Sequence, residues 1–225
     1  MKKIVLSLVF VGLLYQSQAQ VYLGGKAGIS FLSMTRGGLW ERDYDDLGNL
    51  GFNFGASFEY VVSDYFTLYP KLMFARKGTE WYKKTGSTRS DIYNLNYLEI
   101  PLTVKINYPL DLFTRTLDIY AQIGPQVSFL IGGKASEQGT SIIGLRVLKV
   151  EEFFNERNQE YKKFDAGLIL GFGTALHIGP GKLLLEADYD LSFINLAEDQ
   201  PILFYYKALG AHRVWSIDVG YLYEF

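Results

Sequence analysis

The sequence lacks cysteine and holds only 6 prolines in 225 residues. Without cysteine, this sequence can form no disulfide bond, thiol nucleophile, cysteine-ligated metal site or lipid-modified cysteine anchor. The formal net charge is also small, at −2, so no basic surface indicates a nucleic-acid partner. These absences exclude several functional classes and indicate a chain that folds without covalent cross-links.

The only long apolar run lies at the N-terminus and has the features of a secretory signal peptide. Lys2 and Lys3 precede the run, and the small residue Ala19 follows it at the expected cleavage point. The run is about half the roughly 20 residues that a membrane-spanning helix requires. We therefore expect a cleaved signal at residues 1–19 and a single mature domain at residues 20–225.

Aromatic residues are abundant, with 17 tyrosines and 16 phenylalanines, and they favour half-buried strands. Alternation of apolar and polar residues recurs in eight runs, each as long as the roughly 9–11 residues of a membrane-spanning strand. The pattern predicts an all-β fold, an eight-stranded antiparallel up-and-down transmembrane barrel. The expected strands are residues 21–31, 52–62, 65–76, 97–107, 117–131, 163–176, 182–193 and 213–225.

The connections between these strands alternate in length, as in outer-membrane barrels. We expect four long extracellular loops and three short periplasmic turns. The loops are residues 32–51, 77–96, 132–162 and 194–212, and the turns are residues 62–65, 107–116 and 177–182. The third loop is compatible with either an amphipathic helix or an extended hairpin.

One parity of each strand is apolar, and across 48 positions of this parity, which leave out Arg76 and Arg213 at strand ends, no residue is charged. The other parity carries the charged side chains. A soluble barrel of the lipocalin type would alternate in the same way with its apolar face inside. Two observations favour the membrane. Complete exclusion of charge matches the cost of about 2–4 kcal/mol for a charge at the bilayer midplane. Outward aromatic residues also form two belts, as expected for two membrane interfaces. The belts are Phe31, Phe52, Phe74, Phe129, Phe164, Phe193 and Trp215, and Tyr60, Phe66, Tyr221, Tyr223 and Phe225.

The polar parity predicts a plugged lumen, because the side chains of eight strands about fill the space that the strands enclose. Lys26, Lys71 and Lys105 should each contact carboxylates on neighbouring strands, since isolated buried charges are strongly disfavoured. Their first candidate partners are Glu59, Glu99 and Asp218. Acids outnumber lysines in this expected lumen, which holds Lys26, Lys71, Lys105 and Lys182 against Glu59, Glu99, Asp118, Asp165, Glu186, Asp188, Asp190, Asp218 and Glu224.

The remaining candidates for chemistry favour structural roles. His177 opens an expected turn, and His212 lies beside Arg213 without a serine at a defined spacing, so neither histidine completes a catalytic set. Gly171 and Gly173 lie inside a strand, which excludes a phosphate-binding loop.

Three inward acids, Glu186, Asp188 and Asp190, lie on one strand at intervals of about 7 Å. They are too spread for a metal site unless another strand contributes a ligand. We predict no catalytic residue, no cofactor and no metal.

Five segments are typical barrel motifs: YLEIPLTVK at 97–105, GPQVSFLIGG at 124–133, KFDAGLILGFG at 163–173, LEADYDLSFINL at 185–196 and GYLYEF at 220–225. They resemble a known family, the small outer-membrane β-barrel proteins of Bacteroidetes. These proteins are often labelled PorT-like or "outer membrane protein beta-barrel domain". The resemblance covers essentially the whole mature chain and implies a fold similar to the OmpA transmembrane domain. It also implies that the terminal Phe225 helps to present the chain to the barrel assembly machinery.

The expected function is that of a non-enzymatic scaffold or interaction module in the outer membrane, acting through its extracellular loops. Its expected partners are outer-membrane lipid, the barrel assembly machinery and an envelope or secretion protein. Three alternatives stay open: an accessory of a type IX-like secretion system, which the family resemblance implies, a narrow channel, and a lipid-modifying enzyme.

Overall fold

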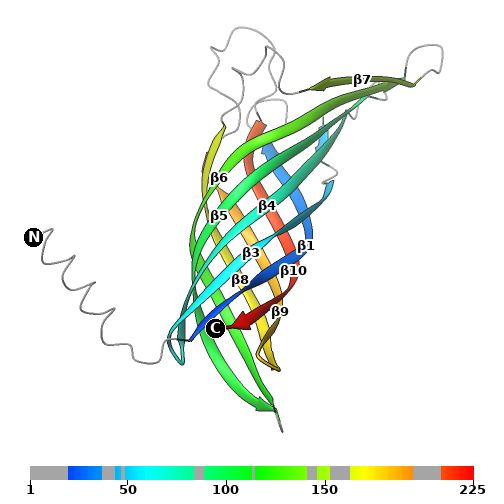
Figure 1. Ribbon diagram of the computed structural model, residues 1–225. Helices are drawn as coiled ribbons and strands as arrows, with labels where there is room; N and C mark the ends of the chain where they lie inside the picture. The colour runs from blue at the N-terminus through cyan, green and yellow to red at the C-terminus, as the bar shows by residue number, and fades with distance from the viewer. Residues whose placement is uncertain are drawn as a thin grey trace, which may run out of the picture.

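In the computed structural model, all described elements are β-strands of one sheet (Figure 1). The structure describes residues 20–36, 44–46, 49–83, 89–112, 115–140, 146–152, 163–194 and 209–225; the expected signal peptide, residues 1–19, lies outside them. The strands are β1 (Val21–Arg36), β2 (Tyr44–Asp46), β3 (Asn49–Ser63), β4 (Phe66–Lys83), β5 (Arg89–Leu112), β6 (Arg115–Thr140), β7 (Arg146–Glu152), β8 (Phe164–Ile178), β9 (Gly181–Ser192) and β10 (Leu209–Glu224).

Eight of these strands close into an antiparallel barrel, as the sequence predicts. Consecutive strands pair in the order β1, β3, β4, β5, β6, β8, β9 and β10, and β1 pairs with β10 to complete the ring. The closing register runs from Tyr22 opposite Glu224 to Met34 opposite His212, and Arg36 pairs with Leu209 after a register shift. Closure leaves no free edge in the barrel wall, so the backbone groups of the wall are hydrogen-bonded to each other. Among the described residues, no helix is long and apolar enough to span a membrane.

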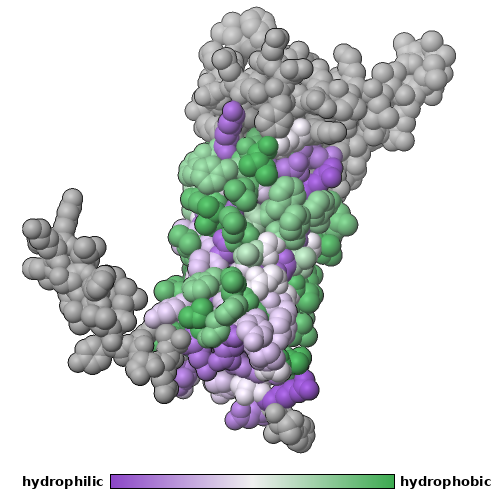
Figure 2. Space-filling model, viewed as in Figure 1, coloured by the Kyte–Doolittle hydropathy of each residue, from purple (hydrophilic) through white to green (hydrophobic). Residues whose placement is uncertain are grey.

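The predicted alternation of faces is confirmed along all eight strands. Apolar side chains point outward and stay exposed, as at Leu102 (54%) and Phe172 (63%), whereas Tyr69 and Lys105 point inward and are at most 1% exposed. Figure 2 shows apolar side chains gathered on the outer wall. Aromatic rings also meet there across strands, with centroids 5.1 Å apart for Phe54 and Phe74. The outer face of the wall is thus an apolar surface that suits contact with lipid.

All four expected long loops are wrong in part, because strands continue into them. Residues 32–51 contain the end of β1, all of β2 and the start of β3, and β10 begins at Leu209 inside residues 194–212. The strands continue furthest into the other two loops. β4 runs to Lys83 and β5 begins at Arg89, so most of residues 77–96 form a hairpin. Within residues 132–162, the end of β6 pairs with β7, which favours the hairpin over the helix there. Outside a lipid belt both faces of a strand meet water, so alternation is no longer required and the strand loses its sequence signal.

These extensions continue the same sheet beyond the barrel wall, at the rim of the long connections. The distal part of β4 pairs with β2 and β5, distal β5 pairs with β6, and distal β6 pairs with β7. We call this five-stranded arrangement the rim sheet. In Figure 1 its β6–β7 part projects sideways from the barrel mouth.

The opposite rim carries the short connections. Ser63 and Phe66 flank a two-residue turn, and the Phe66 amide donates a hydrogen bond of 3.2 Å to Ser63 Oγ. Gly179, at φ 59°, and Pro180 make the other short turn, and the left-handed backbone there favours glycine. The expected turn at residues 107–116 is instead a longer hairpin, since β5 continues to Leu112 and β6 begins at Arg115.

Candidate functional site: the ion-pair network of the lumen

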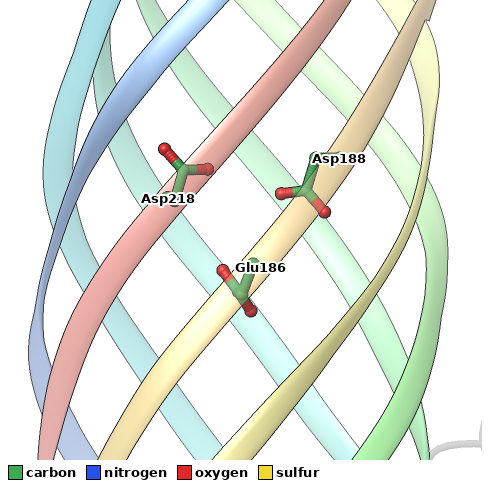
Figure 3. Close-up of side chains that lie close together, drawn as sticks. All are labelled: Glu186, Asp188 and Asp218. Carbon is green, nitrogen blue, oxygen red and sulfur yellow. The ribbon is translucent and has the colours of Figure 1, made fainter.

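The centre of the lumen holds three carboxylates around one lysine. Lys26 Nζ, from β1, lies 2.7 Å from Glu186 Oε2, 3.3 Å from Asp188 Oδ2 and 3.0 Å from Asp218 Oδ2. Glu186 and Asp188 are successive inward residues of β9, and Asp218 faces them from β10 (Figure 3). All four side chains are almost completely buried. This central cluster therefore depends on mutual pairing, because water does not reach these charges.

Neutral donors complete the hydrogen bonds of the two β9 carboxylates. Tyr120 Oη donates to Glu186 Oε1 at 2.7 Å, and Gln122 Nε2 donates to Asp188 Oδ1 at 2.5 Å. Lys71 adds a second ammonium, with Nζ 3.1 Å from Asp188 Oδ2. Both oxygens of each carboxylate are thus engaged.

A second group lies between the central cluster and the short-turn rim. Lys105 pairs with Glu59 at 2.5 Å, and its Nζ lies 3.4 Å from the ring centroid of Tyr69. Lys182 approaches the other Glu59 oxygen at 3.3 Å. Cation–π contact and ion pairing together allow two lysines to share one carboxylate in a dry interior.

A third group lies toward the rim sheet and includes a lysine that the sequence analysis placed in a loop. Lys77 Nζ lies 2.5 Å from Glu99 Oε1 and 2.8 Å from Asp190 Oδ2. Gln126 Nε2 also donates to Asp190 at 2.8 Å. Lys77 continues the inward parity of Lys71 on β4, and that parity was the signal that could have assigned it to the lumen.

The structure brings the expected site residues together in part as anticipated. Lys26 meets Asp218, and Lys105 meets Glu59. Lys71 instead contacts Asp188, and Glu99 pairs with Lys77 rather than with the three expected lysines. Alternation along each strand fixes which residues face inward, but closure of the barrel decides which inward residues meet across the lumen. With Lys77 included, the buried charges of the described lumen are five lysines and seven acids, so acids still outnumber lysines.

Apolar and aromatic side chains fill the lumen among these ion pairs. Tyr22, Tyr69 and Tyr120 pack with Ala175, Leu184 and Leu222 toward the short-turn rim. On the other side, Leu32 and Val214 are inward neighbours across β1 and β10, and each is at most 4% exposed. Leu95 of β5 is fully buried as well. The polar network is therefore packed among buried apolar and aromatic side chains, which help to fill the lumen.

The strand glycines make room for inward side chains. A Cβ at Gly173 would lie 2.6 Å from Tyr120 Oη, so this glycine makes room for the tyrosine ring. A Cβ at Gly171 would lie 2.0 Å from Asp188 Oδ1, so this glycine accommodates a carboxylate instead. Both residues shape the lumen by the absence of a side chain.

The acids that approach each other closely enough for a metal differ from the expected ladder on β9. Oxygens of Glu186, Asp188 and Asp218 lie within 4.8 Å of one another, so β10 supplies the third acid. Asp190 turns away toward Lys77. The Lys26 ammonium lies against all three acids, where a metal ion would lie, so this arrangement holds a lysine rather than a metal.

The two histidines do not form a common site. His177 Nε2 lies 2.9 Å from Asp118 Oδ2 beside the Gly179 turn, with Lys182 Nζ 3.8 Å from the same oxygen. The side chain of His212 lies outside the described part of the chain. The His177 contact resembles the other lumen pairs, in which a carboxylate is shared between basic groups.

Comparison with solved structures finds small outer-membrane barrels. The Yersinia pestis attachment invasion locus protein Ail, in complex with the heparin analogue sucrose octasulfate, is 15% identical (92% of this chain, 99% of that chain, TM-score 0.41). Neisserial surface protein A is 14% identical (91% of this chain, 97% of that chain, TM-score 0.43). OprG from Pseudomonas aeruginosa is 12% identical (92% of this chain, 95% of that chain, TM-score 0.47).

No sequence among the curated proteins matches the chain. A family model does match, over residues 15–198, and it describes the same architecture that the strands and the lumen display. The chain belongs to the outer membrane protein beta-barrel domain family.

Proposed function

We propose that this outer-membrane barrel is a non-enzymatic scaffold that binds an envelope partner protein through its rim sheet. The observation that carries the proposal is the continuation of β4, β5 and β6 beyond the lipid-facing wall. A sheet that grows directly out of a closed barrel is a rigid platform, and rigid platforms position recognition surfaces with little loss of entropy on binding. The export of the chain by a cleaved signal peptide and an extracellular position of the rim sheet are parts of the same proposal.

The filling of the lumen by buried apolar side chains and ion pairs supports a scaffold over a channel. A continuous water path would have to displace the buried layer around Tyr69 and Leu222, both 0% exposed, and would then cross paired charges. Purified protein in a planar bilayer should therefore give no steady conductance. A stable, cation-selective current from the folded barrel would support the narrow channel instead.

The binding role is tested by shortening the rim sheet. In the test variant a short Gly-Ser turn replaces residues 134–152, which removes the β6–β7 hairpin and leaves the barrel wall complete. After crosslinking in intact cells, the wild type should co-purify with an envelope protein that the variant does not capture. Heat-modifiable electrophoretic migration of the variant verifies that its barrel is folded. Equal crosslinking of the same protein by both forms would contradict the proposal.

The identity of that partner is a finer proposal, for which the family resemblance supplies the candidate. If the protein is an accessory of a type IX-like secretion system, the crosslinked protein should be a component of that system, and deletion of the barrel should reduce secretion. A lipid-modifying enzyme predicts a different result, namely a changed lipid profile on deletion and on replacement of His212.

A further inference from the structure

Three buried oxygens beside the central cluster have no hydrogen-bond partner among the described residues. They are Ser30 Oγ on β1, Asn53 Oδ1 on β3 and Asp218 Oδ1 on β10. The three residues are 2%, 9% and 1% exposed. Because buried polar atoms in folded proteins are nearly always paired, a group of unpaired oxygens indicates an unseen ligand or water.

The strand register places these oxygens on one patch of the lumen wall. Gly28 of β1 pairs with Asn53 on one side and with Asp218 on the other. A Cβ at Gly28 would lie only 2.1 Å from Asp218 Oδ1, so this oxygen occupies the space that a side chain at Gly28 would need. Ser30, the next inward residue of β1, has its Oγ 2.6 Å from where a Cβ of Gly51 on β3 would lie. We call this set of oxygens the Gly28 cluster.

The chemistry of the Gly28 cluster suits a cation. The oxygens of Asp218 and Asn53 can only accept hydrogen bonds or coordinate positive charge. Lys26, the lysine that pairs with Asp218, contacts its other oxygen and divides its charge among three carboxylates. Figure 3 shows how closely Asp218 lies to the two β9 acids. The excess of acids in the lumen adds a general demand for positive charge.

We propose that the Gly28 cluster binds one hard monovalent cation of the sodium class. Asp218 Oδ1, Asn53 Oδ1 and Ser30 Oγ would coordinate it, with water completing the shell. Hard cations take oxygen ligands, and Ca²⁺ gathers six to eight of them, often from several carboxylates. Here the oxygens of Glu186 and Asp188 are already engaged by Lys26, Lys71, Tyr120 and Gln122. One free carboxylate oxygen with two neutral oxygens matches a single positive charge.

The test compares unfolding of the purified full-length barrel in sodium chloride and in choline chloride at equal ionic strength. Choline is too large for the cluster, so it controls for screening. Sodium binding to the folded state alone should raise the apparent unfolding temperature, by about 5–11 °C once sodium reaches 100 times its dissociation constant. The increase should saturate with sodium concentration.

Variants assign the effect to the Gly28 cluster. Asn53→Ala and Ser30→Ala each remove one neutral ligand and should abolish most of the sodium-dependent increase, whatever their effect in choline. Asp218→Asn should do the same if it folds. Ser128→Ala is the matched control, since Ser128 is an equally buried inward serine on β6 and should keep the full increase. Equal unfolding temperatures of the wild type in the two salts would overturn the proposal and leave water as the occupant. A sodium effect unchanged in all cluster variants would also overturn it.

Discussion

Replacement of Lys77 by methionine is the sharpest test of the lumen network, because it removes one ammonium that serves two buried carboxylates. Lys77 is 4% exposed at its side chain, and its partners Glu99 and Asp190 are 10% and 12% exposed. Methionine keeps much of the volume of the lysine stem. The change therefore mainly leaves the two carboxylates without their cationic partner. Removal of one partner from a buried ion pair costs about 3–5 kcal/mol.

The lower end of this range applies here, because Gln126 still donates a hydrogen bond to Asp190. A loss of about 3 kcal/mol corresponds to a decrease of about 6–12 °C in the unfolding temperature of a domain of this size. The assay is thermal unfolding of the purified barrel in detergent, followed by the heat-dependent change in electrophoretic migration and by circular dichroism.

Arg76→Met provides a matched control on the neighbouring residue. Arg76 lies on the same strand with its side chain exposed on the outer face, so its replacement should change the unfolding temperature little. Combining Lys77→Met with Asp190→Asn should recover part of the lost stability, since the second substitution removes one of the two unpaired buried charges. The reasoning is refuted if Lys77→Met unfolds at the wild-type temperature, or if Arg76→Met lowers the temperature by the same amount.

Three further predictions concern other parts of the barrel. Lys71→Met should also lower the unfolding temperature by several degrees, since it removes the 3.1 Å contact to Asp188; wild-type unfolding would show that Lys71 is solvated. A membrane-impermeant thiol reagent should label Gly139→Cys on intact cells and spare Ser63→Cys, and the reverse pattern would invert the proposed orientation. Deletion of Phe225 should reduce the amount of barrel in the outer membrane, measured by immunoblotting of membrane fractions, and a normal amount of folded protein would remove the proposed assembly role of this residue.

The membrane wall of the barrel was predictable because one physical constraint acts on every second residue. Lipid excludes charge from the outward positions, and a narrow polar interior accepts it at the inward ones. Along β9, for example, Leu183, Leu185 and Ala187 alternate with Glu186 and Asp188, and this pattern alone assigns both faces. The same constraint is absent beyond the wall, where β4 continues past Arg76 and where the sequence analysis expected only loops.

The partners across the lumen were not predictable from the pattern, because they depend on closure of the ring. Lys26 and Glu186 are 160 residues apart and lie on strands that are not neighbours, since β10 runs between β1 and β9. Their meeting requires the tilt of all eight strands and the register of each pair. For the same reason Glu99 meets Lys77, which no spacing along the chain relates to it.

The sequence by itself determined the all-β class, the number of wall strands and the orientation of each side chain in the wall, because alternation under lipid is a local property. Only the tertiary structure decided the rim sheet, the three groups of ion pairs and the Gly28 cluster. Each of these depends on which strands become neighbours, and on how far opposite walls of a narrow barrel stand from each other. These are distances in space that a one-dimensional pattern of apolar and polar residues does not encode.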